Sequence, residues 1–156
     1  REPVHDGDGV LDGFQGLCMI LALILATSLF LISVGSHLVI LNAGHSLLEQ
    51  NRSLLHKLSI ALLVLFSHLT VAAFFAAGFW IGEELGLGGF RQANAMTAMD
   101  YFYFSLINVT TLGLADIFPT DHLRVLAGVE ALTGFALISC SAQLFWSMMK
   151  KGNDHE

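Results

Sequence analysis

The chain has 156 residues, of which 54% are hydrophobic and only 13% are charged, and its formal net charge is −6. An average soluble domain carries about 25% charged residues, so this composition excludes a disordered chain and argues against a soluble globular domain. The negative charge also argues against nucleic-acid binding through a basic patch. We therefore expect an integral membrane protein in contact with a lipid bilayer.

Three long apolar runs predict three transmembrane helices, at about 14–41, 57–82 and 122–149. Each run is longer than the ~20 residues that a helix needs to cross the hydrocarbon core of a bilayer. No charged residue interrupts the first two runs, and Glu130 is the only one in the third run after Arg124.

An apolar stretch at 101–115 is too short to span a bilayer and predicts a buried or re-entrant segment. A glycine-rich loop, 83–96, precedes it. Thr97 and Asp100 have the spacing of a capping box, which predicts a short helix from about 98 to 110. Because this helix ends at membrane depth, the non-helical backbone after it must be buried in protein or line water.

Residues 103–119 read YFSLINVTTLGLADIFP. This segment resembles the pore helix and selectivity filter of the tetrameric potassium-channel superfamily, whose pattern is roughly F-S-x-x-T-x-T-T-V-G-Y-G-D-x-x-P. The segment from Arg124 to Gly134 resembles the inner helix of that family. The resemblance covers about 57–149 and implies an all-α membrane fold with three transmembrane helices, a re-entrant pore helix and a filter loop. The helix at 14–41 is an addition to the two-helix pore.

A potassium ion sheds its water only where oxygen atoms replace it, and rings of backbone carbonyls from several chains can supply them. The resemblance implies that Thr111, Leu112 and Gly113 supply such rings and bind K+ or Na+ there. No other cofactor is expected. Because one chain cannot close a ring, the resemblance implies a homotetramer. The candidate ion-binding residues are Thr110, Thr111, Leu112, Gly113, Leu114, Ala115 and Asp116.

Two positions depart from the family pattern, since Leu114 replaces its filter tyrosine and Ala115 its second filter glycine. Leucine lacks the hydroxyl that ties the filter to the pore helix, and alanine resists a left-handed backbone by about 1 kcal/mol per chain. Two functions therefore stay open. One is a potassium-channel-like cation channel with passive permeation and reduced selectivity. The other is a non-conducting or regulatory membrane protein that retains the channel fold.

Six residues of the third long helix are candidates for gating or for lining a cavity: Glu130, Gly134, Phe135, Ile138, Ala142 and Phe145. Glu130 either braces the pore helix through Ser105 or Asn108, or attracts cations in the cavity. Gly134 is either a hinge or a close helix contact. Phe145 either closes the pore by dewetting or belongs to an interfacial aromatic belt.

His37 and His68 lie within the first two predicted helices. They either bond to serine or backbone groups in a helix interface, sense protons, or ligate a haem iron. The last alternative is the sole basis for a redox enzyme, so we do not expect an enzyme.

The expected organisation has three parts: 1–56 with the additional helix and a cytoplasmic loop, a pore domain at 57–149, and a short cytoplasmic tail at 150–156. Three crossings place the two ends on opposite sides of a plasma or inner membrane. The cytoplasmic side is the one with more basic residues. That criterion places the C-terminus in the cytoplasm, because Arg52, Lys57, Lys150 and Lys151 outnumber Arg1, Arg91 and Arg124.

Overall fold

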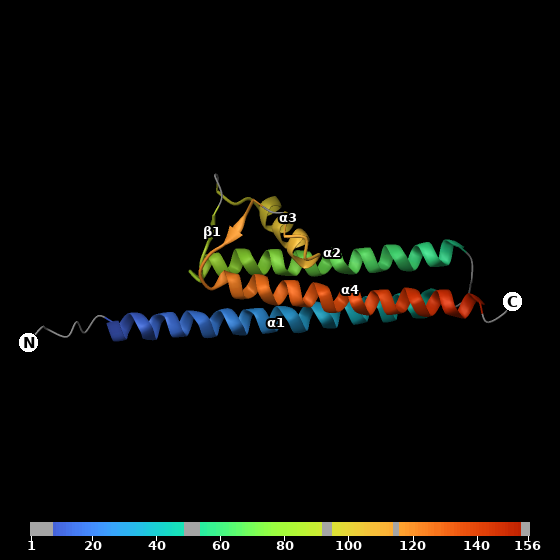
Figure 1. Ribbon diagram of the computed structural model, residues 1–156, viewed down its shortest axis with the longest axis horizontal. Coiled ribbons are helices and arrows are strands. Elements are labelled where there is room, and N and C mark those ends of the chain that lie inside the picture. Colours follow the sequence, from blue (N-terminus) through green and yellow to red (C-terminus); the bar gives the residue numbers. More distant parts are fainter. Residues whose placement is uncertain (1–7, 49–53, 92–94, 114–115, 154–156) are drawn as a thin grey trace, which may run out of the picture.

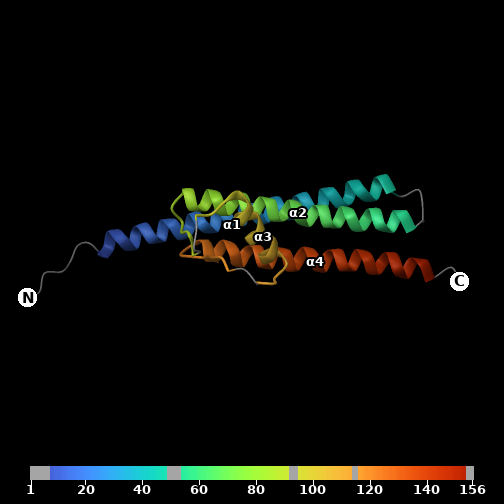
Figure 2. The ribbon, with the colours of Figure 1, turned by 90° about the horizontal axis from the view of Figure 1, so that it is seen from above.

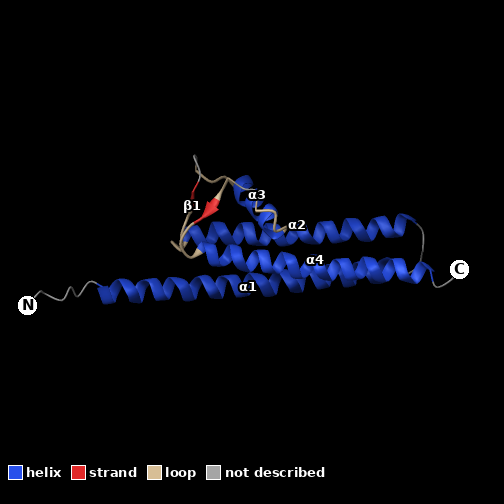
Figure 3. Cartoon of the chain, viewed as in Figure 1, coloured by secondary structure: helices blue, strands red, loops and turns tan. Residues whose placement is uncertain are grey.

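The computed structural model describes residues 8–48, 54–91, 95–113 and 116–153. Helices dominate it, as Figure 3 shows, together with one very short pair of strands. The elements in chain order are α1 (Asp8–Leu48), α2 (Leu54–Glu84), β1 (Phe90–Arg91), α3 (Ala98–Val109), β2 (Phe118–Pro119) and α4 (Leu123–Asn153).

The three long helices α1, α2 and α4 lie side by side along the long axis of the molecule (Figures 1 and 2), and α1 contacts both of the others. Among the described residues, three stretches are long and apolar enough to cross a membrane: Gly13–Asn42, Lys57–Glu84 and Leu123–Gln143. The three predicted spans are therefore confirmed. Each helix continues into polar residues beyond its predicted C-terminal end. Neither of the two prolines, Pro3 and Pro119, lies within these helices to stop them.

The short helix α3 is inclined to the long helices and rests on α2 and α4 (Figure 1). Its first turn carries the predicted capping box. The Asp100 backbone N–H donates to the Thr97 hydroxyl over 3.3 Å, and the Thr97 backbone N–H donates to Asp100 Oδ2 over 2.8 Å. Hydrogen bonds from the Thr97 hydroxyl and then from its backbone lower the pKa of Asp100.

A two-residue antiparallel pairing ties together the segments before and after α3. Phe90 pairs with Pro119, and the Thr120 N–H donates to the Gly89 carbonyl over 2.8 Å. The two backbone segments approach closely here. A Cβ on Gly88 would lie only 2.5 Å from the Thr120 carbonyl oxygen. The sequence does not predict these strands, since two residues are too few for an alternating pattern.

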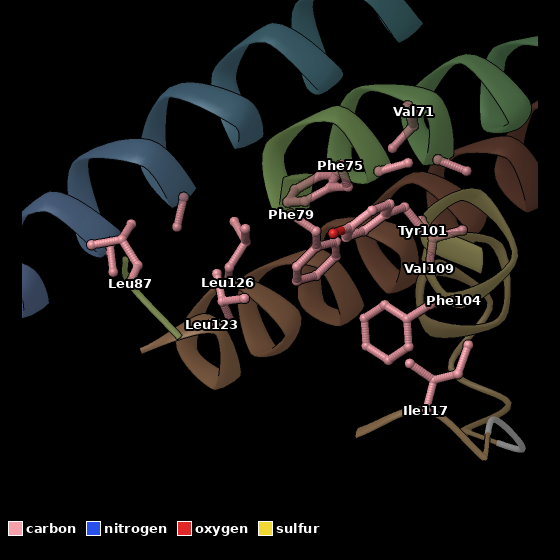
Figure 4. Close-up of a cluster of buried hydrophobic side chains, with 14 of the residues drawn as sticks. Val71, Phe75, Phe79, Leu87, Tyr101, Phe104, Val109, Ile117, Leu123 and Leu126 are labelled. Carbon is pink, nitrogen blue, oxygen red and sulfur yellow. The ribbon is translucent and has the colours of Figure 1, made fainter. Parts of the chain in front are cut away.

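Aromatic side chains fix α3 to α2 (Figure 4). Phe104 of α3 meets Phe79 of α2 edge-to-face with ring centroids 5.0 Å apart, and it meets Phe90 of β1 at 5.2 Å. Phe75 and Phe79 are fully buried in the same cluster. Edge-to-face pairs at these distances add about 0.5–1.5 kcal/mol each beyond the burial of their area. The position of α3 is thus determined by packing along its length.

Candidate functional site

The backbone at the end of α3 forms a Schellman motif. The Leu112 N–H donates to the Ile107 carbonyl over 3.1 Å, and the Thr111 N–H donates to the Asn108 carbonyl over 2.9 Å. This motif places its left-handed residue directly after the helix cap, where glycine is usual. Here that residue is Thr111, with φ 59°. A β-branched residue in this conformation costs about 1–2 kcal/mol, and backbone strain of this kind gathers at functional sites.

The predicted filter segment leaves the body of the single chain. Thr111, Leu112 and Gly113 are exposed, and so is Asp116. Leu112 in particular is 61% exposed although it is apolar. Gly113 has φ 62°, so positive φ recurs two residues after Thr111. Leu114 and Ala115, the two residues that depart from the family's filter pattern, lie outside the described residues.

Thr110 differs from the residues that follow it. It caps α3 with an ordinary helical φ of −82°, and its hydroxyl lies 3.1 Å and 3.0 Å from the carbonyl oxygens of Leu106 and Ile107. Its side chain is therefore turned back on the helix.

Glu130 joins α4 to α3 from behind this segment. Its side chain is fully buried. Its Oε1 is bonded to the Ser105 hydroxyl, and its Oε2 accepts from Asn108 Nδ2 over 2.6 Å. These are the two partners that the bracing alternative predicts. A role as an open cavity charge is wrong for this arrangement, because the carboxyl group lies between helices and no part of it reaches the surface.

Gly134 lies one helical turn beyond Glu130 and packs against the last turn of α3. A Cβ at this position would overlap the carbonyl oxygen of Val109. Helix α4 continues unbroken through the glycine. The structure thus places Gly134 at a close helix contact, which is the second of its two predicted roles, and the hinge stays a prediction.

The comparison with protein families decides the class of the protein. A family model described as ion channel matches residues 59–151, which is more than half of the chain. The chain belongs to this ion-channel family. The match spans most of α2, all of α3 and most of α4, whereas α1 lies outside it. No curated protein and no solved structure in the comparisons matches the chain.

Family and structure together describe an integral membrane ion channel with three apolar spanning helices. Ion passage is the activity that the family assigns, which supports the expectation that the chain is not an enzyme.

Four other residues of α4, predicted to gate or line a cavity, lie on the face of this helix that packs against no other helix in the described part of the chain. Phe135 is 66% exposed and Ile138 is 42% exposed, Ala142 is also exposed, and Phe145 is half-buried. Their spacing of three or four residues places them in one stripe. The opposite stripe of α4, with Thr133 and others, is buried in the bundle.

The two intramembrane histidines of the channel meet between α1 and α2. His37 Nδ1 lies 2.6 Å from Ser67 Oγ, and His68 Nδ1 donates to the Val64 carbonyl over 2.8 Å. The two rings contact each other edge-to-face with centroids 5.2 Å apart. The alternative of serine and backbone partners in a helix interface is therefore confirmed. Ser67 itself is a partner that the sequence analysis did not single out.

A second anchor was missed by the sequence analysis. The Tyr101 hydroxyl at the start of α3 donates to Glu83 at the end of α2. Burial, followed by this bond and by the charges of Glu83 and Glu84, raises the pKa of Tyr101. The only sequence signal was an acidic residue at the end of an apolar run. The pairing needs the fold to bring residues 18 positions apart into contact.

Proposed function

We propose that the protein is one subunit of a homotetrameric, potassium-channel-like cation channel. Monovalent cations, K+ or Na+, pass passively through rings of backbone carbonyls from Thr111, Leu112 and Gly113. Helix α3 is the re-entrant pore helix, α2 the outer helix and α4 the inner helix, and residues 57–149 form the pore domain. The protein spans a plasma or inner membrane with its C-terminus in the cytoplasm.

The backbone after α3 is the observation that carries this proposal. Positive φ at Thr111 and again at Gly113 gives the alternating handedness with which consecutive carbonyl groups can point to one side. The segment is exposed in a single chain, as a pore-lining segment of a tetramer must be. The C-terminal end of α3 also carries the partial negative charge of a helix terminus, which favours a cation nearby.

The exposed stripe of α4 supports the same arrangement. In a ring of four subunits, Phe135, Ile138 and Ala142 face the central cavity below the filter, and Phe145 lies near its cytoplasmic mouth. Asp116 adds an acidic ring at the outer mouth that concentrates cations.

Cation flux into liposomes tests the proposal. The purified protein is reconstituted, and uptake of a labelled K+ tracer is measured for the wild type and two glycine variants. Gly113→Ala places a side chain at φ 62° and should reduce flux strongly. Gly128→Ala is the matched control, because a Cβ there meets no atom within 4 Å, and it should keep wild-type flux.

A non-conducting membrane protein that retains the fold is the second candidate, and the replacements Leu114 and Ala115 favour it. An intact tetramer without any cation flux would support that candidate and contradict the channel. A stable monomer or dimer would contradict both the carbonyl rings and the tetramer.

A further inference from the structure

We propose that Glu130 is a positioning residue that acts as a neutral carboxylic acid and donates its proton to the Ser105 hydroxyl. This inference rests on the proposed function only in treating α3 as the pore helix. The proton itself follows from the hydrogen bonds among α2, α3 and α4.

The hydroxyl of Ser105 has one hydrogen but two neighbouring acceptors. One is the Ala72 carbonyl oxygen of α2, 2.6 Å from Ser105 Oγ, and the other is Glu130 Oε1 of α4. A carbonyl can only accept, so the Ala72 contact takes the serine hydrogen. The bond between Ser105 and Glu130 then needs a hydrogen from the carboxyl group.

Asn108 cannot supply the missing hydrogen to Oε1. Its Nδ2 has two hydrogens, and both are used, one by the Ala127 carbonyl over 2.8 Å and one by Glu130 Oε2 over 2.6 Å. With a proton on Oε1, every hydrogen and every acceptor in this group is paired. Without that proton, Ser105 Oγ and Glu130 Oε1 would face each other with no hydrogen between them.

The hydrogen-bonding groups around Glu130 in the described part of the chain are all uncharged. Helix α2 contributes a carbonyl, α3 a hydroxyl and an amide, and α4 itself a carbonyl, while α1 contributes no bonding partner in the described part of the chain. The side chain is fully buried. A carboxylate buried without a cation is strongly unfavourable, whereas a neutral acid with both oxygens bonded is not.

The protonated acid completes a chain of bonds across three helices, from Glu130 through Ser105 to Ala72. One turn further along α4, Gly134 contacts Val109 at the end of α3. Together these contacts hold the helix turn that precedes Thr111. Loss of the proton removes one bond of the chain, so Ser105 keeps its bond either to Ala72 of α2 or to Glu130 of α4 but not both, and the filter backbone loses part of its support.

Infrared difference spectroscopy of the detergent-solubilised channel tests the proton directly. The spectrum of the wild type minus that of Glu130→Gln at neutral pH should contain the carbonyl band of a protonated carboxylic acid. An ionised-carboxylate band in its place would overturn the inference. This readout does not depend on conduction, so a channel without flux that shows the acid band would contradict the proposed function and leave the inference intact.

Substitutions test the positioning role. Glutamine can donate to Ser105 and accept from Asn108 as the neutral acid does, so Glu130→Gln should keep the wild-type Tm and the wild-type K+/Na+ reversal potential. Glu130→Ala should lower Tm by about 4–8 °C and shift the reversal potential. Ser139→Ala, which removes an exposed hydroxyl of the same helix, is the matched control and should change neither.

A pH profile separates the acid from a purely structural side chain. Raising the pH until the wild type loses stability or selectivity should leave Glu130→Gln unchanged over the same range, because the amide does not titrate. A Glu130→Gln protein as unstable as Glu130→Ala would show that the charge is required and would overturn the proposal. Parallel pH profiles for the wild type and Glu130→Gln would overturn it as well.

Discussion

Thr111 occupies the backbone position after α3 that glycine usually takes, with φ 59°. Threonine pays about 1–2 kcal/mol for that conformation. An ordinary loop gains nothing from this strain, whereas in the proposed filter the Thr111 hydroxyl forms the innermost oxygen ring. If Thr111 forms that ring, its strain lowers stability in return for function.

We expect Thr111→Gly to raise the stability of the protein by about 1 kcal/mol, because glycine accepts positive φ without strain. The same change should reduce cation flux, since the hydroxyl is lost. Thr110→Gly is the matched control. Its φ is −82° and its hydroxyl bonds to the helix, so glycine there should lower stability. Thermal unfolding measures stability and liposome uptake measures flux, and a destabilised Thr111→Gly would contradict the strain argument.

The close contact between Gly134 and Val109 depends on the absence of a single atom, the Cβ. Gly134→Ala places a Cβ onto the Val109 carbonyl oxygen, and the backbone must shift to relieve the overlap. Overpacking of this kind costs about 1–3 kcal/mol. Gly128→Ala, on the same helix with open space around it, should be neutral or stabilise by up to about 1 kcal/mol through helix propensity. Equal Tm values for the two variants would show that the contact is not tight.

At the scale of the elements, α1 is the helix that the ion-channel match does not include, and yet it packs on α2 and α4. Polar groups mark the seam between α1 and α2, because His37 and Ser67 are both fully buried there and bonded to each other. In a membrane, such polar contacts join helices that lipid could otherwise separate. The seam therefore attaches the additional helix to the two-helix pore.

We expect His37→Ala to lower stability by about 3 kcal/mol, because it leaves a cavity and removes the partner of a buried serine hydroxyl. Ser36→Ala is the control on the same helix. Its half-buried hydroxyl bonds only within α1, to the Ser33 carbonyl over 2.9 Å, so its loss should matter little. Tm measured in detergent distinguishes the two variants. A His37→Ala protein with wild-type Tm would show that this bond does not hold α1 in place.

At the scale of the whole molecule, the proposed pore exists only in an assembly. Native mass measurement in a nanodisc should find four copies of the 16.9 kDa chain. In the proposed tetramer, a substitution in the filter is present in all four subunits, so its effect on the pore is larger than in one chain.

The outer half of the proposed filter should limit selectivity. Leu114→Tyr combined with Ala115→Gly restores the usual family pattern, and we expect it to raise the preference for K+ over Na+ by about tenfold, equivalent to ~1.4 kcal/mol. Reversal potentials under a K+/Na+ gradient provide the measurement. Strong K+ selectivity in the unmodified channel, unchanged by the double substitution, would contradict this reading of the two residues.

Much of the fold follows from local pattern. Three long apolar runs predict the three spanning helices, and the Thr97–Asp100 spacing predicts the start of α3, because hydropathy and capping act within a few residues. The observed helix ends differ from the predicted ones, because α1 runs from Asp8 to Leu48 and not from about 14 to 41. Helical hydrogen bonding continues beyond the hydrocarbon into polar residues, so hydropathy alone underestimates the length.

Hydropathy and the motif at 103–119 are local features, and they establish the membrane class, the resemblance to a channel filter and a short list of partners for Glu130. The tertiary structure then selects among the alternatives. It brought Glu130 to Ser105 and Asn108, Gly134 to Val109, and His37 to Ser67. All of these pairs are separated by 22 to 30 positions and lie on different helices. Such contacts depend on helix rotation and crossing, which side-chain packing sets and no local sequence pattern records.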